Sequence, residues 1–128
     1  MSGSKTFYVG IDIGSVSANT VVLDERRNLL EEHYTRTKGE PLETSLSVLT
    51  EVIHKYGKEN IKLVAATGSG GKLIAPLIGA AFTNEVIAQA KATEIFHPEA
   101  RTIIEMGGQD AKLIFMAPEG EDGKLRIA

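Results

Sequence analysis

Hydrophobic and polar residues alternate with a period of two near the start of the chain. In the run from Phe7 to Ile13, every second residue is apolar and the residues between are Tyr8, Gly10 and Asp12. This pattern is typical of a β-strand with one packed face, and it places Asp12 on the other face near the carboxyl end. Two more strands are predicted, at Thr20 to Leu23 and at Leu29 to Thr37, so the chain begins with an antiparallel meander.

The spacing becomes helical at Pro41, a favoured first helical residue. Apolar side chains then recur at helical intervals, at Leu42, Leu46, Leu49, Ile53 and Tyr56. They predict one face of an amphipathic helix that ends at Gly57. The short apolar run from Lys62 to Thr67 follows this helix, which predicts a parallel crossover and a buried strand.

The remaining chain predicts shorter elements separated by glycine and proline. Pro76 limits a helical segment from Leu73 to Ile78 to a turn or two, and Asn84 is a suitable cap for a helix from Glu85 to Phe96. Further strands are predicted at Thr102 to Met106, Ala111 to Met116 and Lys124 to Ile127. The predicted fold class is therefore α/β, with a mixed sheet flanked by helices.

Composition narrows the possible functions. The chain has 128 residues with a net charge of −3, so it offers no basic surface for nucleic acid or an anionic membrane. No apolar stretch is long enough to span a bilayer, and the start lacks the apolar core of a secretory signal, so we expect a cytoplasmic protein. Cysteine is absent, which excludes disulfides and thiolate metal ligands from this chain.

Two glycine turns share one chemical pattern, an acid between apolar residues followed by glycine and a small residue. They are Ile11-Asp12-Ile13-Gly14-Ser15 and Ile104-Glu105-Met106-Gly107-Gly108. Backbone N–H groups of such a turn can bind phosphate oxygens, and the acid at the strand tip can hold Mg²⁺ through its water shell. A third glycine turn, Thr67 to Gly71, lies between them. Together they predict a site for a magnesium phosphoanhydride, although glycine in either turn alone could serve only the turn.

Other nucleotide and catalytic motifs are excluded by single positions. A phosphate loop ending at Gly71-Lys72 would need glycine at Ala66, and a dinucleotide fingerprint from Gly68 would need glycine at Leu73. The three histidines have no metal-ligand spacing. No Gly-x-Ser-x-Gly elbow is present, so Ser15, Ser17 and Ser69 are interpreted as turn residues or hydrogen-bond donors.

Three motifs taken together resemble those of one ATPase family. They are Gly10-Ile11-Asp12-Ile13-Gly14-Ser15, Ala66-Thr67-Gly68-Ser69-Gly70 and Glu105-Met106-Gly107-Gly108-Gln109-Asp110-Ala111-Lys112. The sequence resembles the ATPase activators of 2-hydroxyacyl-CoA dehydratases and benzoyl-CoA reductases, a branch of the superfamily of actin, sugar kinases and heat-shock ATPases. The resemblance covers nearly the whole chain, and the third motif is its most specific part.

This resemblance implies a ribonuclease-H-like first subdomain over residues 1–100 and the opening strands of a truncated second subdomain over 101–128. It assigns catalytic roles to Asp12, Glu105 and Gln109, with Asp12 holding Mg²⁺ through water. The nucleotide-binding residues that it implies are Gly14, Ser15, Thr67, Gly68, Gly107, Gly108, Asp110 and Lys112. Many relatives have lysine where this chain has Asn19, and aspartate where it has Glu105.

The family also implies cofactors and partners. Its members bind Mg-ATP or Mg-ADP between two domains, form a homodimer around a shared [4Fe-4S] cluster, and drive an electron into an acyl-CoA dehydratase or reductase component. Because the family's cluster cysteines lie beyond the second phosphate motif, we expect this chain to be an amino-terminal piece of a larger activator. Alone, it is expected to be inactive and to bind nucleotide weakly if at all. Its exposed second-subdomain strands could fold back onto the first subdomain or pair with a second copy, and a dimer is favoured. The alternative is another superfamily member, a sugar kinase or exopolyphosphatase, or a nonenzymatic nucleotide sensor.

Overall fold

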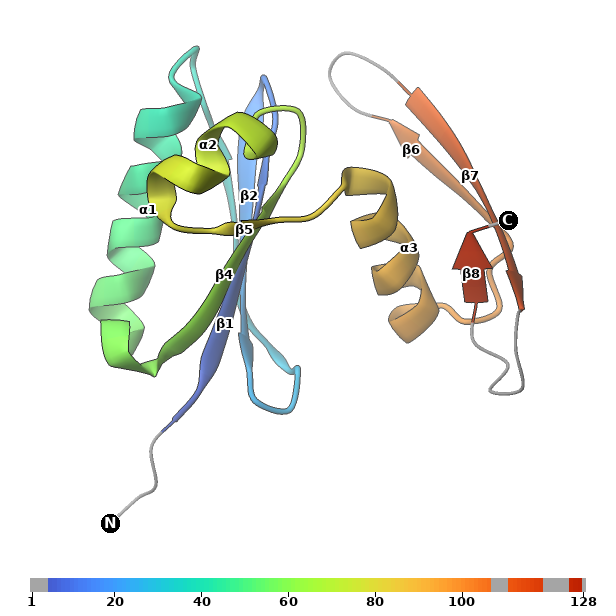
Figure 1. Ribbon diagram of the computed structural model, residues 1–128, viewed down its shortest axis with the longest axis horizontal. Helices are drawn as coiled ribbons and strands as arrows, with labels where there is room; N and C mark the ends of the chain where they lie inside the picture. The colour runs from blue at the N-terminus through green and yellow to red at the C-terminus, as the bar shows by residue number, and fades with distance from the viewer. Residues whose placement is uncertain (1–4, 107–110, 119–124, 128) are drawn as a thin grey trace. The chain divides into compact units, whose positions relative to one another are not determined.

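The computed structural model describes residues 5–106, 111–118 and 125–127, with the side chains of 5–104 and 113–116. The chain forms two compact units, Met1–Thr83 and Asn84–Ala128, and Figure 1 shows the elements of each. The first unit contains one sheet and two α-helices, and the second contains one helix and three strands. The predicted subdomain boundary near residue 100 stays a prediction.

Five strands form the sheet of the first unit in the order β3-β2-β1-β4-β5. They are β1 (Phe7–Ile13), β2 (Ser17–Asp24), β3 (Leu29–Arg36), β4 (Ile61–Thr67) and β5 (Ala81–Phe82). The first three strands are antiparallel neighbours, whereas β4 is parallel to β1 and β5 is parallel to β4. The predicted meander and the predicted parallel crossover are both confirmed.

The core of this unit lies on one face of the sheet, under α1 (Pro41–Tyr56) and α2 (Gly71–Ile78) (Figure 1). Alternate side chains of β1 are buried there and pack against both helices. The two buried clusters comprise Phe7, Val9, Val22, Leu49 and Val52, and Ile11, Ile13, Ala18, Ala66, Ile74 and Ala75. Because side chains alternate along a strand, Asp12 lies on the opposite face, as predicted.

The buried face of α1 differs from the predicted stripe. Leu46 is 42% exposed, and the buried residues of α1 are Ser45, Val48, Leu49 and Val52. Ser45 tolerates burial because its hydroxyl donates a hydrogen bond to the carbonyl oxygen of Pro41 at 2.7 Å. Ser45 is therefore buried in α1, whereas Leu46, which the apolar spacing had placed on the buried face, is exposed.

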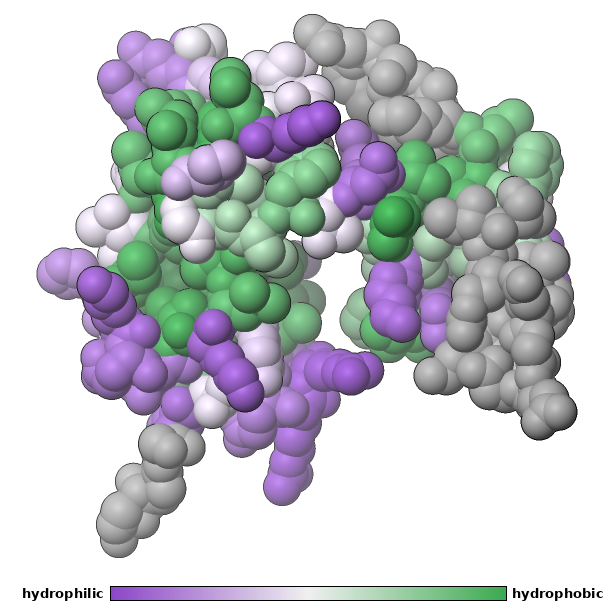
Figure 2. All heavy atoms as spheres, in the orientation of Figure 1, coloured by the Kyte–Doolittle hydropathy of each residue, from purple (hydrophilic) through white to green (hydrophobic). Residues whose placement is uncertain are grey.

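One further expectation about the sheet was wrong, and one strand was missed. Strand β4 is not buried throughout, since both helices pack on one face and Leu63 is 48% exposed. Strand β5 was not predicted, because it is only two residues long and has no readable periodicity. Hydrophobic side chains also remain on the surface of the first unit (Figure 2). On α2, Leu73 is 76% exposed and Leu77 is 65% exposed. Within the described residues, no helix is long and apolar enough to cross a membrane.

The second unit consists of α3 (Glu85–Phe96) and a sheet of β6 (Thr102–Met106), β7 (Ala111–Pro118) and β8 (Leu125–Ile127). The predicted cap of α3 is confirmed, because the side chain of Asn84 accepts a hydrogen bond from the amide of Val86 at 2.8 Å. Ala90, Ile114 and Met116 form a small core. On the other face of the sheet, Ile104, Leu113 and Phe115 are each more than half exposed.

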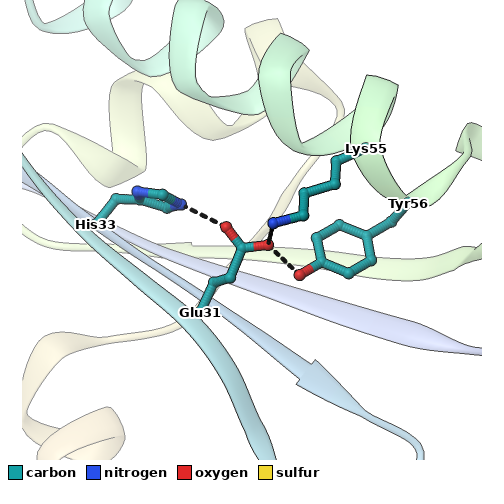
Figure 3. A network of polar contacts seen from close by, with 4 residues as sticks. All are labelled: Glu31, His33, Lys55 and Tyr56. Carbon is teal, nitrogen blue, oxygen red and sulfur yellow. Dashed lines mark hydrogen bonds and ion pairs between the residues drawn. The ribbon is translucent and has the colours of Figure 1, made fainter.

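A polar network ties the end of α1 to the edge strand β3 (Figure 3). The carboxylate of Glu31 receives hydrogen bonds from Lys55 at 2.7 Å, from the Tyr56 hydroxyl, and from His33 at 3.0 Å when that ring nitrogen is protonated. Hydrogen bonds from Lys55 and then Tyr56 lower the pKa of Glu31 to about 2. Burial, followed by the hydrogen bond to Glu31, raises the pKa of Tyr56 to about 12.

These two pKa shifts predict that the network stabilises the fold only between acid and alkaline limits. Glu31 contributes above the ordinary glutamate pKa, and its contribution is lost as the pH falls toward 2. Tyr56 contributes below the ordinary tyrosine pKa, and its contribution is lost as the pH rises toward 12. We expect Glu31→Gln to lower the free energy of unfolding at neutral pH by about 1 kcal/mol, a value reduced for contact with solvent.

Urea unfolding between pH 2 and pH 7 tests this expectation. Glu31→Gln should flatten the acid limb of the stability profile. Glu32→Gln is the matched control, because Glu32 is the next residue of β3 and is exposed. An unchanged acid limb in Glu31→Gln would contradict the assigned role of the network.

Candidate functional site

The candidate site lies at the carboxyl ends of β1 and β4. Because these strands are parallel neighbours, their carboxyl ends meet at one edge of the sheet, with Asp12 paired to Thr67. Figure 1 shows the β1–β2 turn and the loop leading into α2 at this same end of the first unit. Five sequence-predicted residues, Asp12, Gly14, Ser15, Thr67 and Gly68, are therefore brought close together.

The β1–β2 turn is a tight hairpin closed by a hydrogen bond from the amide of Gly14 to the carbonyl of Ser17 at 2.9 Å. The amide of Gly14 is thus already used. Ser15 and Val16 form the tip, and within the described part of the chain their amides donate no hydrogen bond. The amides at this turn that could bind an anion are therefore those of Ser15 and Val16. Gly14 has no side chain and would let a ligand come close to the backbone of the turn.

The loop after β4 packs directly against the end of β1. Gly68 has φ +94°, and a Cβ atom there would lie 2.3 Å from Oδ1 of Asp12 and 2.5 Å from the carbonyl oxygen of Ile13. Gly70 donates its amide to the same Ile13 carbonyl at 2.8 Å. Glycine at position 68 is required both by its backbone conformation and by the carboxylate beside it.

The surroundings of Asp12 also contain polar groups suited to a charged ligand. The Thr67 hydroxyl is buried and has no hydrogen-bond partner in the part of the chain that the structure describes. Helix α2 begins at Gly71, directly after this loop, and its amino end has no side-chain cap. A helix amino end bears partial positive charge, and an unpartnered buried hydroxyl is costly without a partner. Phosphate and metal-bound water would supply such partners, so these residues fit a magnesium nucleotide.

Magnesium itself would have one protein carboxylate in this unit. Among residues 5–106, 111–118 and 125–127, no group of three or more histidine or acidic residues could hold a metal ion. Mg²⁺ commonly binds through one or two carboxylates together with substrate phosphates and retains several waters. Asp12 alone therefore fits a metal that arrives with the nucleotide, and it does not fit a permanent protein metal centre.

Thr37 is a site neighbour that no sequence pattern indicated. Its hydroxyl donates to the carbonyl of Ser15 at 2.9 Å, and its amide donates to the carbonyl of Val16, also at 2.9 Å. Thr37 is 1% exposed. It follows β3 and precedes α1, so nothing in the local sequence connects it with a turn 22 residues earlier.

The other predicted site residues belong to the second unit. Glu105 and Lys112 are paired across β6 and β7 by their backbones. Gly107, Gly108, Gln109 and Asp110 lie outside the described residues. Asn19, where many relatives have lysine, is exposed and pairs directly with Asp12 across β1 and β2. The roles of Glu105, Gln109 and the other residues implied by resemblance stay predictions.

Comparison with known proteins places this geometry in a family context. No family model matches the chain. The 2-hydroxyisocaproyl-CoA dehydratase activator of Clostridioides difficile is 30% identical over 116 residues, which cover 89% of this chain and 42% of that protein. The activator of lactoyl-CoA dehydratase from Anaerotignum propionicum is 31% identical over 116 residues, covering 89% and 44%. The (R)-2-hydroxyglutaryl-CoA dehydratase activating ATPase of Acidaminococcus fermentans is 27% identical over 112 residues, covering 84% and 42%.

A solved structure agrees with these relatives. The activator of the 2-hydroxyisocaproyl-CoA dehydratase from Clostridium difficile with bound ADPNP matches with a TM-score of 0.72 and 28% identity, over 96% of this chain and 45% of that chain. The fold is therefore an actin-like ATPase fold with a ribonuclease-H-like mixed sheet, as predicted. Within that class, the predicted resemblance to activators of 2-hydroxyacyl-CoA dehydratases is confirmed. The chain spans less than half the length of the curated relatives that it matches.

The contact between Gly68 and Asp12 predicts different costs for alanine at two glycines with positive φ. At Gly39, φ is +79° and a Cβ atom would meet nothing within 4 Å, so Gly39→Ala should lower the free energy of unfolding by about 1–2 kcal/mol through backbone strain alone. Gly68→Ala adds a collision with Asp12 and Ile13 to a similar strain. We expect it to lower the free energy of unfolding by at least twice as much.

Denaturant unfolding of both variants measures this difference, and amide spectra show where the backbone moves. Gly68→Ala should shift the amide signals of Asp12 and Ile13, whereas Gly39→Ala should leave them in place. Equal losses of unfolding free energy in the two variants, with an undisturbed Asp12 signal, would show that Gly68 does not lie in contact with the Asp12 carboxylate.

Proposed function

We propose that the chain provides the phosphate-binding motifs of an ATPase that activates a 2-hydroxyacyl-CoA dehydratase. The observation that supports this most directly is the approach of Gly68 to Asp12, with two unused turn amides nearby. The relatives support it further, since one is an activating ATPase and a structural match binds ADPNP, an ATP analogue. Sugar kinase, exopolyphosphatase and nucleotide-sensor functions are not favoured by these relatives.

In the proposed mechanism, the amides of Ser15 and Val16 bind phosphate oxygens at the hairpin tip. Asp12 would hold the magnesium ion that accompanies the nucleotide, through a bound water, and a metal there would supply positive charge next to the transferring phosphoryl group. The partnerless Thr67 hydroxyl and the uncapped amino end of α2 would both favour negative charge at the site. We assign Glu105, Gln109 and the glycines Gly107 and Gly108 to the second phosphate motif, with Asp110 and Lys112.

The relatives' names also bear on the partner. Each of the three names a different acyl-CoA dehydratase, so we propose a dehydratase of that class as the partner and leave its acyl group open. A homodimer and a cytoplasmic location are part of the same proposal. The chain has no cysteine, so its residues do not fit a [4Fe-4S] cluster, and no step of the mechanism is assigned to one within these 128 residues.

Nucleotide binding gives the first test of the proposal. We expect Mg-ADP to bind in the millimolar range and to shift the amide signals of Ser15, Val16 and Gly68 in nuclear magnetic resonance titrations. ADP without magnesium should bind more weakly, because Asp12 then repels the phosphates. In Asp12→Asn this dependence on magnesium should disappear, since the charge that holds the metal is gone.

Glu25→Gln is the matched control, because Glu25 is an exposed acid in the turn at the opposite end of β2. It should retain the magnesium dependence of the wild-type chain. The absence of any amide shift with Mg-ADP, or shifts confined to residues far from the β1–β2 turn, would contradict the proposed nucleotide site.

ATP hydrolysis and dehydratase activation are tested with the proposed complete activator that contains this sequence. Asp12→Ala should abolish ATP hydrolysis while leaving the thermal unfolding midpoint nearly unchanged, because the acid lies at a strand tip and adds little to stability. ATP-dependent activation of a 2-hydroxyacyl-CoA dehydratase, supplied with a low-potential reductant, should be lost in the same variant. Normal hydrolysis in Asp12→Ala would remove Asp12 from the reaction.

A further inference from the structure

Thr37 contacts the β1–β2 turn at its backbone carbonyl groups. Its hydroxyl and its amide donate to two successive carbonyls, those of Ser15 and Val16. Both bonds are 2.9 Å long, and Thr37 is almost completely buried. One residue thus fixes both carbonyls at the tip of the hairpin.

Fixing a carbonyl also fixes the amide that belongs to the same peptide group. The described chain has no cis peptide bonds, so the N–H of Val16 points opposite to the carbonyl of Ser15. The Thr37 hydroxyl therefore determines the direction of the Val16 amide. That amide is one of the two donors at the tip that no other group in the described residues uses.

The position of Thr37 decides where that amide is directed. Thr37 directly follows β3 and is 1% exposed, so the Ser15 carbonyl is directed at a buried hydroxyl. The Val16 amide belongs to the same trans peptide group and therefore points away from Thr37.

We propose that Thr37 is the positioning residue of the phosphate-binding turn and that the Val16 amide is the phosphate donor it orients. This inference rests on the proposed nucleotide function and adds Thr37, a residue that the sequence motifs do not indicate. Thr37 does not touch the phosphate. It acts by holding the Ser15–Val16 peptide group in the orientation that phosphate needs.

Thr37 is also joined to the start of α1, which makes its own position rigid. Its carbonyl accepts hydrogen bonds from the amide of Glu40 at 2.8 Å and from the hydroxyl of Thr44 at 3.4 Å. Through Thr37, the β1–β2 hairpin is consequently connected to the start of α1. A donor that is oriented before binding loses little freedom when phosphate arrives.

The test compares three threonine variants of the full chain by Mg-ADP titration with nuclear magnetic resonance detection. Thr37→Val keeps the shape of the side chain but removes the hydroxyl, and we expect its affinity for Mg-ADP to fall about tenfold. Thr37→Ser keeps the hydroxyl and should bind within about twofold of the wild-type chain. Thr20→Val is the matched control, because Thr20 is equally buried but its hydroxyl has no partner among the described residues. It should bind as the wild-type chain does.

A second measurement on the unaltered chain keeps the proposal testable if Thr37→Val does not fold. Addition of Mg-ADP should slow hydrogen exchange at the Val16 amide and shift its signal, as expected for a new bond to phosphate. Wild-type affinity in Thr37→Val, or a Val16 amide that ignores Mg-ADP while Ser15 and Gly68 respond, would overturn this inference alone. No response at any residue of the turn would instead overturn the proposed function.

Discussion

The register of β1 between β2 and β4 is the constraint on which the site depends. Four alternate side chains of this strand are buried on one face, so a slip of one residue would expose all of them and bury Asp12. The same register pairs Asp12 with Asn19 on one side and with Thr67 on the other. Hydrophobic burial on the core face thus determines which polar groups meet on the opposite face, with no direct attraction among them required.

Sequence patterns were most informative where one interaction dominates. The limits of β1 and α3 were predicted correctly, because strict alternation and an asparagine cap are each decided within a few residues. The orientation of α1 was predicted less well. Its apolar spacing alone cannot show that Ser45 satisfies its own hydroxyl within the helix and so can be buried in place of Leu46.

The candidate site shows the same division. Asp12 and Gly68 were predicted as site residues from the glycine motifs and the resemblance that these motifs carry. The structure adds a physical reason for glycine at position 68: its φ is positive, and a Cβ atom there would collide with the Asp12 carboxylate. Thr37 could not be identified in this way. Its contacts reach back 22 residues to carbonyl oxygens, which are present in every residue and leave no mark on the sequence. Motifs reveal residues whose own type is required, whereas a residue that acts on another's backbone becomes visible only in three dimensions.

The two contacts that build this strand-end site differ in sequence separation: the β1–β2 turn is local, whereas the contact of Gly68 with Asp12 is long-range. The β1–β2 hairpin joins neighbouring segments, so its turn can form from local contacts early in folding. Gly68 reaches Asp12 only after β4 has paired with β1 across the whole of β2, β3 and α1, a long loop whose closure is entropically unfavourable. A nascent or partly folded chain can therefore present the turn without the glycine loop. In the proposed site, phosphate binding would accordingly report on completion of the parallel pairing, because the Gly68 contact forms only when that long loop has closed.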